Sequence, residues 1–499
     1  MGALSFKRGG ALTVSVLVAC ALAAGLAISI TIGPSGRGVG HHLQQPGSHP
    51  SRTTTYLTES QCLATPSIRL PCYDPVQIET AYDEEPLLAE GVDGRGETIA
   101  IVDSFGSPTI RRDLDTFDAQ FVLPSPPSLR IIQPAGAVSA YDPKTTTMVG
   151  WAGETTLDVE WAHAAAPGAN LLLVETPVSE TEGTIGFPEI VAAENYVVRH
   201  RLADVISQSF GANERTFSSA SMLESLRSAF VAAAAARVTV VASTGDTGVS
   251  DYTTATGKTL STTPTVTWPA SDPLVTAVGG TQISLSASGA RTAPDRVWND
   301  SYNAVANRFV FGTSQPHANA SGGGLSSVFS TPSYQQGVAD VVGDHRGIPD
   351  ISMSAACSGL VDTYQSFGGP TPPGWYYVCG TSESAPLFAG IVALADQEAH
   401  RSLGCIDPAL YAMKRAHDRG IVPVTRGDNS VSFEQGGSEH TIVGYKASAG
   451  YDLATGLGTV DAAEFVPELV HAVAAVGSSV SYGFLQRLPT GGAENGGRG

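Results

Sequence analysis

The chain has 499 residues, of which 42% are hydrophobic, and it contains 55 glycines and 31 prolines. This length and composition are typical of a globular, loop-rich protein with one large core or two to three ordinary domains. Its formal net charge of -19 argues against nucleic acid or an anionic membrane surface as a partner, because both require an excess of Lys and Arg.

The first 58 residues are expected to precede the folded domain. Two basic residues come before an apolar run from Ala11 to Ile32, so residues 1–32 are predicted to be a secretory signal or a single N-terminal membrane anchor. Both alternatives place the protein outside the cell, either secreted or held on the outer face of the membrane. Residues 33–58 are rich in Gly, Pro, Ser and His and are predicted to be a flexible linker.

From residue 76 onward, helix-like and strand-like patterns alternate. Helices are expected over 76–91, 111–121, 153–166, 190–202, 221–236 and 385–400, and strands over 98–102, 169–176, 204–211 and 238–242. Such alternation predicts an α/β fold with a mostly parallel sheet and helices on both faces. Residues 282–322 are polar and irregular, and we expect them to form a surface excursion. Neither a phosphate loop nor a GxGxxG motif follows the first strand, which argues against nucleotide chemistry.

The six cysteines are few for this length. Cys62 with Cys72, and Cys357 with Cys379, are plausible disulfides in an exported protein, each contributing about 3 kcal/mol. Cys405 is then left over. A zinc site is disfavoured because CxxC spacing is absent from the sequence.

Ser382 lies in the segment CGTSESAPLFAG, residues 379–390, where a turn meets a predicted helix. Gly380 can adopt backbone angles that other residues avoid, and Pro386 is expected in the first helical turn only. A serine at this position is either a helix N-cap or a nucleophile whose hydroxyl leaves a rigid elbow close to backbone amides. The segment alone leaves both alternatives open.

Four carboxylates are candidates for supporting chemistry. Glu154 and Asp158 are four residues apart, which places both on one face of a helix. The alternative is a helix whose first turn carries acids that complement its dipole. Asp103 and Asp246 each follow an apolar strand, at the sheet edge where α/β enzymes place functional groups. For these two the alternatives are a helix cap and a turn aspartate.

A Ser–His–Asp triad would require a histidine beside Ser382. His163 is nine residues from Glu154, about half a turn round the helix, so the two side chains cannot share a face. We therefore predict that His163 is structural and that any base for Ser382 is a carboxylate.

Together these motifs resemble the sedolisins, serine-carboxyl peptidases with a subtilisin-like fold. The matching segments span roughly residues 75–465 and are GETTLDVEWAHAAAPGA, VISQSFG, ASTGDTG, WPASDPLVTAVGGT, SGGGLSSVF, RGIPDIS and GTSESAPLFAG. The resemblance implies a peptidase domain over residues 59–484, with a mostly parallel sheet and helices on both faces. Residues 485–499 are Gly-rich and are expected to be a disordered tail.

By position in these motifs, the resemblance implies that Ser382 is the nucleophile, Glu154 the general base and acid, Asp158 its partner and Asp246 the oxyanion-hole acid. A carboxylate suits acid chemistry because an imidazole is almost wholly protonated near pH 4 and cannot accept the serine proton. The expected function is acid peptide hydrolysis by a monomeric endopeptidase acting on protein or peptide substrates. Glu383, next to the nucleophile, is expected to face solvent or a binding cleft.

Two rival functions remain. A catalytically inactive extracellular binding module on the same fold would lack one of the four site residues, and all four are present. A neutral serine peptidase would use Asp103, His163 and Ser382. A profile of activity against pH separates these alternatives, because the module is silent throughout and the neutral enzyme is active where imidazole is uncharged.

The resemblance also implies a C-terminal calcium site. The positions that match its ligands are Asp452 and the backbone carbonyls of Ser448, Gly450 and Val424. Pro423 stands where the family pattern has an aspartate, which removes one of two charged ligands. Calcium binding is therefore left open, with Asp428 as a candidate substitute ligand.

Overall fold

The computed structural model describes residues 70–369, 372–416 and 418–479. The expected signal or anchor, the linker, Cys62 and the C-terminal tail lie outside these residues, as do both limits of the predicted peptidase domain. Within the described part of the chain, no helix combines the length and the apolar character needed to cross a membrane.

The centre of the fold is an eight-stranded sheet in the order β10-β9-β7-β5-β2-β4-β3, with β13 paired to β9. All neighbours run parallel except β10 with β9. The mostly parallel sheet is confirmed. Its strands are β2 Thr98–Ser104, β3 Leu129–Ile132, β4 Asn170–Thr176, β5 Val205–Gln208, β7 Thr239–Ser243, β9 Thr276–Gln282, β10 Arg296–Val297 and β13 Ile351–Ser354.

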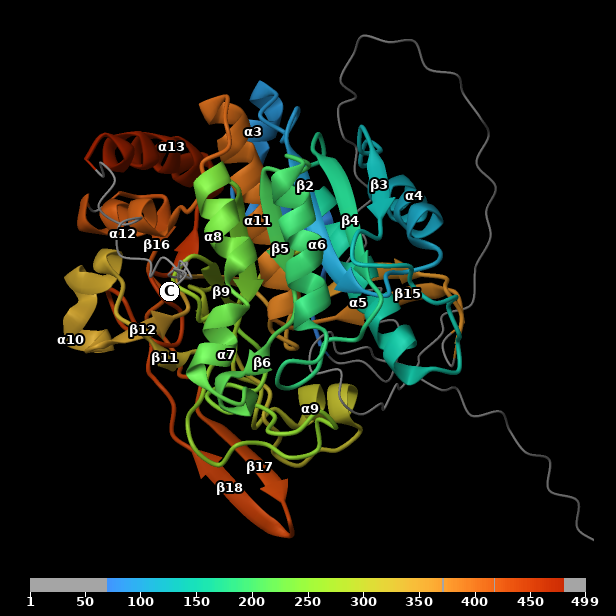
Figure 1. Ribbon diagram of the computed structural model, residues 1–499, viewed down its shortest axis with the longest axis vertical. Helices are drawn as coiled ribbons and strands as arrows, with labels where there is room; N and C mark the ends of the chain where they lie inside the picture. The colour runs from blue at the N-terminus through green and yellow to red at the C-terminus, as the bar shows by residue number, and fades with distance from the viewer. Residues whose placement is uncertain (1–69, 370–371, 417, 480–499) are drawn as a thin grey trace, which may run out of the picture.

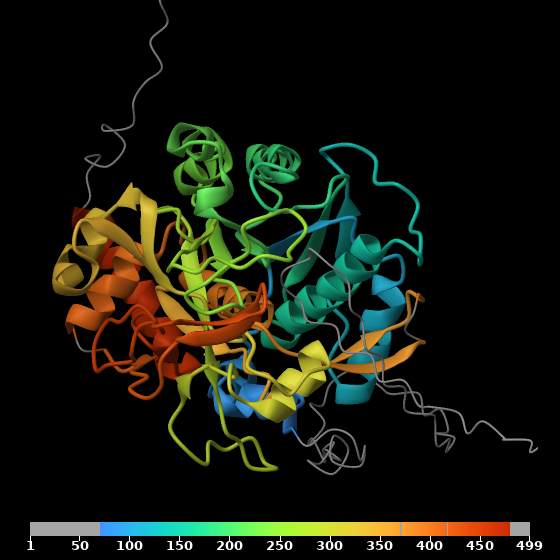
Figure 2. The ribbon, with the colours of Figure 1, turned by 90° about the horizontal axis from the view of Figure 1, so that it is seen from below.

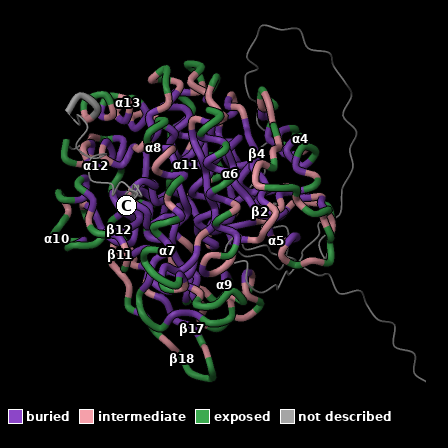
Figure 3. Tube along the Cα trace, in the orientation of Figure 1, coloured by how far each residue is buried: buried purple, intermediate pink, exposed green. Residues whose placement is uncertain are grey.

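Helices cover both faces of this sheet, as predicted (Figures 1 and 2). Side chains of β2 alternate between the faces: Ala100 and Val102 belong to the core beneath α6 (Phe187–Arg199) and α8 (Ser228–Ala236). Ile99 and Ile101 belong to the core on the other face, beneath α5 (Thr146–Ala165) and α11 (Thr381–Ala399). Figure 3 shows the sheet and α11 as the buried centre of the molecule, while α6 and α8 expose their outer sides. The fold is therefore the predicted α/β class.

Two predicted helices are each interrupted. The first becomes α2 (Pro75–Ala81) and α3 (Glu85–Glu90), because Asp83 adopts a positive φ of 57° between them. The other becomes α7 (Ala220–Ser225) and α8, and here Arg227 turns to bind the buried carboxylate of Asp272. Apolar periodicity continues through both breaks, which is why the sequence predicts single helices.

The predicted surface excursion over 282–322 is wrong in part. Trp298 is 1% exposed and packs with Ala306 of α9 (Ala304–Phe311) in a separate core cluster. The same cluster contains the disulfide between Cys357 and Cys379, whose Cα atoms are 4.9 Å apart. This bridge is confirmed, and Cys405 is a free cysteine.

The remaining elements surround the central sheet. They are β1 Cys72–Tyr73, α4 Ile110–Phe121, β6 Ala212–Asn213, β8 Thr267–Trp268, β11 Gly324–Ser330, α10 Ala339–Val342, β12 His345–Ile348, β14 Leu360–Gln365, β15 Gly374–Val378, α12 Asp407–Ala416, β16 Ile421–Val422, β17 Val431–Gln435, β18 Ser438–Ile442, β19 Thr459–Val460 and α13 Ala462–Ser479. Two short 3₁₀ turns cover Glu214–Thr216 and Ser333–Val338.

Candidate active site

The site forms where α5 and α11 pack against each other. A Cβ placed on Gly390 of α11 would lie 2.5 Å from the Cβ of Ala165 on α5, closer than real side chains approach. Small residues at this contact therefore let the two helices come together. Because Glu154 and Asp158 lie on α5 and Ser382 lies on α11, this packing brings the predicted nucleophile and carboxylates to one place.

Ser382 is not the helix cap. Helix α11 begins at Thr381, and the capping position belongs to Gly380, whose φ of 134° favours glycine. Pro386 lies inside the helix rather than in its first turn. Proline has no N–H for the carbonyl four residues earlier, and the hydroxyl of Ser209 lies 3.4 Å from that carbonyl oxygen of Ser382. Ser209 thereby contacts the backbone of Ser382 at the carbonyl to which Pro386 cannot donate a helical hydrogen bond.

Three carboxyl groups share the buried space next to Ser382. Glu154 is 2% exposed, while Asp158 and Asp103 are fully buried. Burial raises the pKa of Glu154 well above 4.5; a hydrogen bond with the Ser382 hydroxyl lowers it, and the charges of Asp103 and Asp246 raise it. The hydroxyl therefore supports the ionised form of Glu154 in particular. The cluster as a whole retains protons that exposed carboxylates would release.

The pKa values of the other two carboxyl groups, Asp158 and Asp103, are raised as well. Burial raises the pKa of Asp158 well above 3.8, and the charges of Asp103 and Glu154 raise it further. Burial raises the pKa of Asp103 to about 7. Thr109, not Asp103, occupies the capping position of α4, so Asp103 belongs with the buried cluster. The two helix carboxylates are buried, unlike the solvated acids of an ordinary first turn.

Sequence reasoning missed Ser209, which donates a hydrogen bond of 2.8 Å from its hydroxyl to Asp158. This serine directly follows β5, which lies between β2 and β7 in the sheet. Its place at the carboxyl end of a central parallel strand is the signal that could have identified it.

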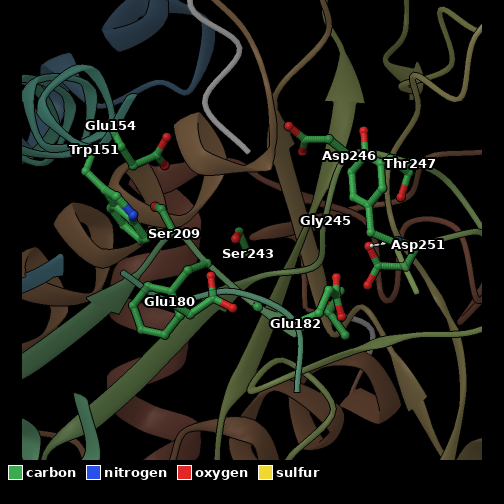
Figure 4. Close-up of a pocket in the computed structure, with 14 residues that line it drawn as sticks. Trp151, Glu154, Glu180, Glu182, Ser209, Ser243, Gly245, Asp246, Thr247 and Asp251 are labelled. Atoms are coloured by element: carbon green, nitrogen blue, oxygen red, sulfur yellow. Dashed lines mark hydrogen bonds between the residues drawn. The ribbon is translucent and has the colours of Figure 1, made fainter. Parts of the chain in front are cut away.

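Asp246 lies in the loop after β7, and its Oδ1 accepts hydrogen bonds of 2.8 Å from both the backbone N–H and the hydroxyl of Thr381. These bonds fix the aspartate to the residue before Ser382. Gly322 donates its N–H to the Gly245 carbonyl, and a Cβ on Gly322 would lie 1.9 Å from the Thr244 carbonyl oxygen. Only glycine fits so close to the loop that carries Asp246. Figure 4 shows Glu154 and Asp246 lining one cavity from two directions.

Two further side chains considered from the sequence, His163 and Glu383, do not line this cavity. His163 is buried, with Nε2 2.8 Å from the Pro124 carbonyl and 3.3 Å from Asp118, so its contacts lie toward α4 and are structural. Glu383 is fully buried, so the expectation that it faces solvent or a cleft is wrong. Burial raises its pKa well above 4.5, whereas a hydrogen bond with Ser354 lowers it.

The residues at the expected calcium site do not fit the metal. Calcium takes six to eight oxygen ligands, of which carboxylates are the strongest. Asp452 is the one carboxylate at the matching positions, and its oxygens accept backbone N–H groups of Ser448, Ala454 and Thr455 at 2.8–3.0 Å. Pro423 supplies no carboxylate.

Neighbouring side chains do not supply the missing carboxylate ligand. Asp428 accepts the Ser430 N–H at 3.0 Å. Among residues 70–369, 372–416 and 418–479, no group of three or more His, Cys, Asp or Glu side chains is arranged to hold a metal ion.

The fold and site define a protein of the subtilase class, with a serine on a central helix facing acids on a neighbouring one. The family model described as the Subtilase family matches residues 135–436. In a solved structure, Pseudomonas sedolisin (serine-carboxyl proteinase) complexed with two molecules of pseudo-iodotyrostatin, the match has a TM-score of 0.65 and 28% identity, and it covers 80% of this chain and 98% of that one.

Similar curated proteins agree with this class. Kumamolisin of Bacillus sp. (strain MN-32) is 30% identical over 402 residues, covering 78% of this chain and 62% of the relative. Tripeptidyl-peptidase 1 of Homo sapiens is 28% identical over 319 residues, covering 61% and 50% respectively. The chain belongs to the sedolisin family. It spans between half and two thirds of the length of these relatives.

Proposed function

We propose that the protein hydrolyses peptide bonds in acid through an acyl-enzyme formed on Ser382. The convergence of this serine with buried carboxyl groups from α5 is the observation that carries the proposal. Glu154, which shares a hydrogen bond with the Ser382 hydroxyl, would accept its proton during attack and return it to the leaving amine. Asp158 would act as the partner of Glu154, its orientation fixed by Ser209.

Asp246 is proposed to stabilise the oxyanion of the tetrahedral intermediate. Thr381 donates two hydrogen bonds to its Oδ1, so the proton of the neutral acid is carried by Oδ2, which donates to the developing negative charge. Ionised, the same carboxylate would repel the oxyanion. This role requires the neutral acid, so we expect the activity to fall as the pH rises towards neutral.

The proposal is tested with peptide substrates between pH 3 and 8. Ser382→Ala and Glu154→Gln should abolish cleavage, and Asp246→Ala should reduce kcat by about 10²–10³-fold, the usual effect of losing an oxyanion donor. Ser384→Ala is the matched control, since Ser384 lies on the same helix but donates its hydroxyl to the carbonyl of Ser354.

The outcomes separate the alternatives. Wild-type activity that peaks in acid and disappears in Ser382→Ala supports the proposal. Activity that peaks above about pH 7 and survives Glu154→Gln would refute the carboxylate mechanism. A correctly folded wild-type protein without activity at any pH would favour the inactive binding module.

Endopeptidase action is the mode that we propose, with monomeric protein acting on peptides outside the cell or at its outer surface. Similarity to tripeptidyl-peptidase 1 makes release of N-terminal tripeptides the alternative. Peptides with acetylated N-termini decide between the modes, because an endopeptidase cleaves them and an enzyme that binds a free amino terminus does not.

A further inference from the structure

A cavity of about 50 Å³ adjoins the proposed oxyanion acid and contains carboxyl groups that the proposed chemistry does not use. Glu180 and Glu182 enter it from the segment after β4, and Asp251 enters from the loop that also carries Asp246. In Figure 4 these three carboxyl groups lie across the cavity from those of Glu154 and Asp246. We call Glu180, Glu182, Asp251 and the space between them the acidic pocket.

The carboxyl groups of the acidic pocket lack cationic partners. Glu180 is 7% exposed and Asp251 is 8% exposed, yet Glu180 Oε1 and Asp251 Oδ2 have no hydrogen-bond partner. Among the ion pairs of the described residues, none includes Glu180, Glu182 or Asp251. Unsatisfied buried acceptors cost free energy, and a cluster that retains them next to a reacting centre indicates a ligand that satisfies them.

Glu182 is positioned by the chain around it. Its Oε2 accepts hydrogen bonds from the Asn213 N–H at 3.1 Å and from the Thr216 hydroxyl at 3.0 Å. Asp251 Oδ1 accepts the Tyr252 N–H at 2.8 Å. One oxygen of each of these two carboxyl groups is therefore fixed, which holds the acidic pocket in a defined geometry before any substrate arrives.

We propose that the acidic pocket receives the side chain of the substrate residue whose carbonyl is attacked, and that it selects lysine or arginine there. This inference rests on the proposed function. If Asp246 binds the carbonyl oxygen, the side chain one carbon away meets the nearest cavity, which the same loop lines. Trp151 and Phe210 line the cavity as well and offer apolar surface to the methylene stem of a basic side chain.

Selection of a cation has a predictable dependence on pH. Burial raises the pKa values of Glu180 and Asp251 well above their ordinary values and raises that of Glu182 to about 8. The other titratable groups at the cavity are Glu154, Asp246 and Tyr252, so no cation opposes this effect. A bound ammonium or guanidinium favours the ionised carboxylates, and its binding therefore releases a proton.

The test uses peptides that differ only at the residue before the cleaved bond, which is Lys, Arg, norleucine or Glu. Norleucine has nearly the shape of the lysine stem without its charge. We expect kcat/KM for Lys and Arg to exceed that for norleucine by about tenfold or more, with Glu cleaved worst. The ratio of Lys to norleucine should rise with pH between 4 and 7.

Glu180→Gln and Asp251→Asn, singly and together, should lower the ratio of Lys to norleucine about tenfold while norleucine peptides are still cleaved. Glu182→Gln is a second route to the same measurement if one of these variants does not fold. Glu194→Gln is the matched control, because Glu194 is a buried carboxyl group on α6 that does not line the cavity. It should leave the ratio unchanged.

A second readout does not depend on hydrolysis. Product peptides ending in Lys or norleucine are titrated calorimetrically into the Ser382→Ala variant in buffers of different ionisation enthalpy. Tighter binding of the Lys peptide, with proton release that Glu180→Gln diminishes, supports the acidic pocket even if no peptide is cleaved and the proposed function fails. Equal binding and an unchanged cleavage ratio in the double variant would overturn the inference.

Discussion

Glu194 offers a direct measurement of what a buried carboxyl group does to this fold. It is fully buried on α6, its Oε1 accepts a hydrogen bond from Gln208, and its Oε2 has no hydrogen-bond partner. Burial raises its pKa from 4.5 to about 8, against the lowering effect of the Gln208 hydrogen bond. Glu194 lies outside the acidic pocket, so its substitution tests the energetics of burial separately from catalysis.

The direction in which stability changes with pH follows from how many protons the folded and unfolded states bind. Above pH 4.5 the unfolded chain releases the Glu194 proton while the folded protein still holds it, so stability falls as pH rises until the folded group also ionises near pH 8. A difference of about 3.5 pKa units at 1.36 kcal/mol each corresponds to about 5 kcal/mol. That is a large part of the 5–15 kcal/mol typical of folded proteins.

Glu194→Gln keeps the shape and the acceptor oxygen but cannot ionise. Urea unfolding should therefore give stabilities within about 1 kcal/mol of wild type at pH 5, with the variant more stable by up to about 5 kcal/mol at pH 8. Glu224→Gln, at an exposed position on α7, is the control and should follow wild type throughout. If wild type and Glu194→Gln lose stability in parallel between pH 5 and 8, the reasoning from burial is wrong.

Three further outcomes are expected. Chelation with EDTA should leave the Tm unchanged, because Asp452 is the one carboxylate at the matching positions and its oxygens already accept backbone N–H groups; a fall in Tm that added calcium reverses would contradict this. Gly390→Ala should destabilise the fold by about 1–3 kcal/mol through its contact with Ala165, and Ala165→Gly should restore part of that loss; additive losses would disprove the contact. Replacing Cys357 and Cys379 by serine should cost about 2–4 kcal/mol in urea unfolding, and an unchanged midpoint would show that the bridge constrains little.

Patterns local to one element predicted the main features of the fold and placed the candidate residues. The spacing of Glu154 and Asp158 specifies a shared helix face, and the apolar strand before Asp246 specifies a sheet edge, so both could be placed without coordinates. The apolar β strands likewise identified the parallel sheet. The catalytic roles stay predictions until the variants are measured.

Features that depend on distant parts of the chain could not be predicted in this way. Glu180 and Asp251 are far apart in sequence, and nothing in either segment indicates that they line one cavity. The burial of Glu383 follows from its position at the start of α11, whereas the sequence alone led us to expect a side chain facing solvent or a binding cleft. Ser209 acquires its role only through contact with Asp158.

Helix α11 has a kinetic consequence. It contacts α5, α13 and the strands β2, β5, β7, β9 and β13, so the proposed nucleophile sits on a helix that is buried from Thr381 to Asp396. Local fluctuations that leave most of the fold intact cannot open such a segment. Its amides should exchange with deuterium only through global unfolding, and heat should abolish catalysis and tertiary structure in a single cooperative event rather than in succession.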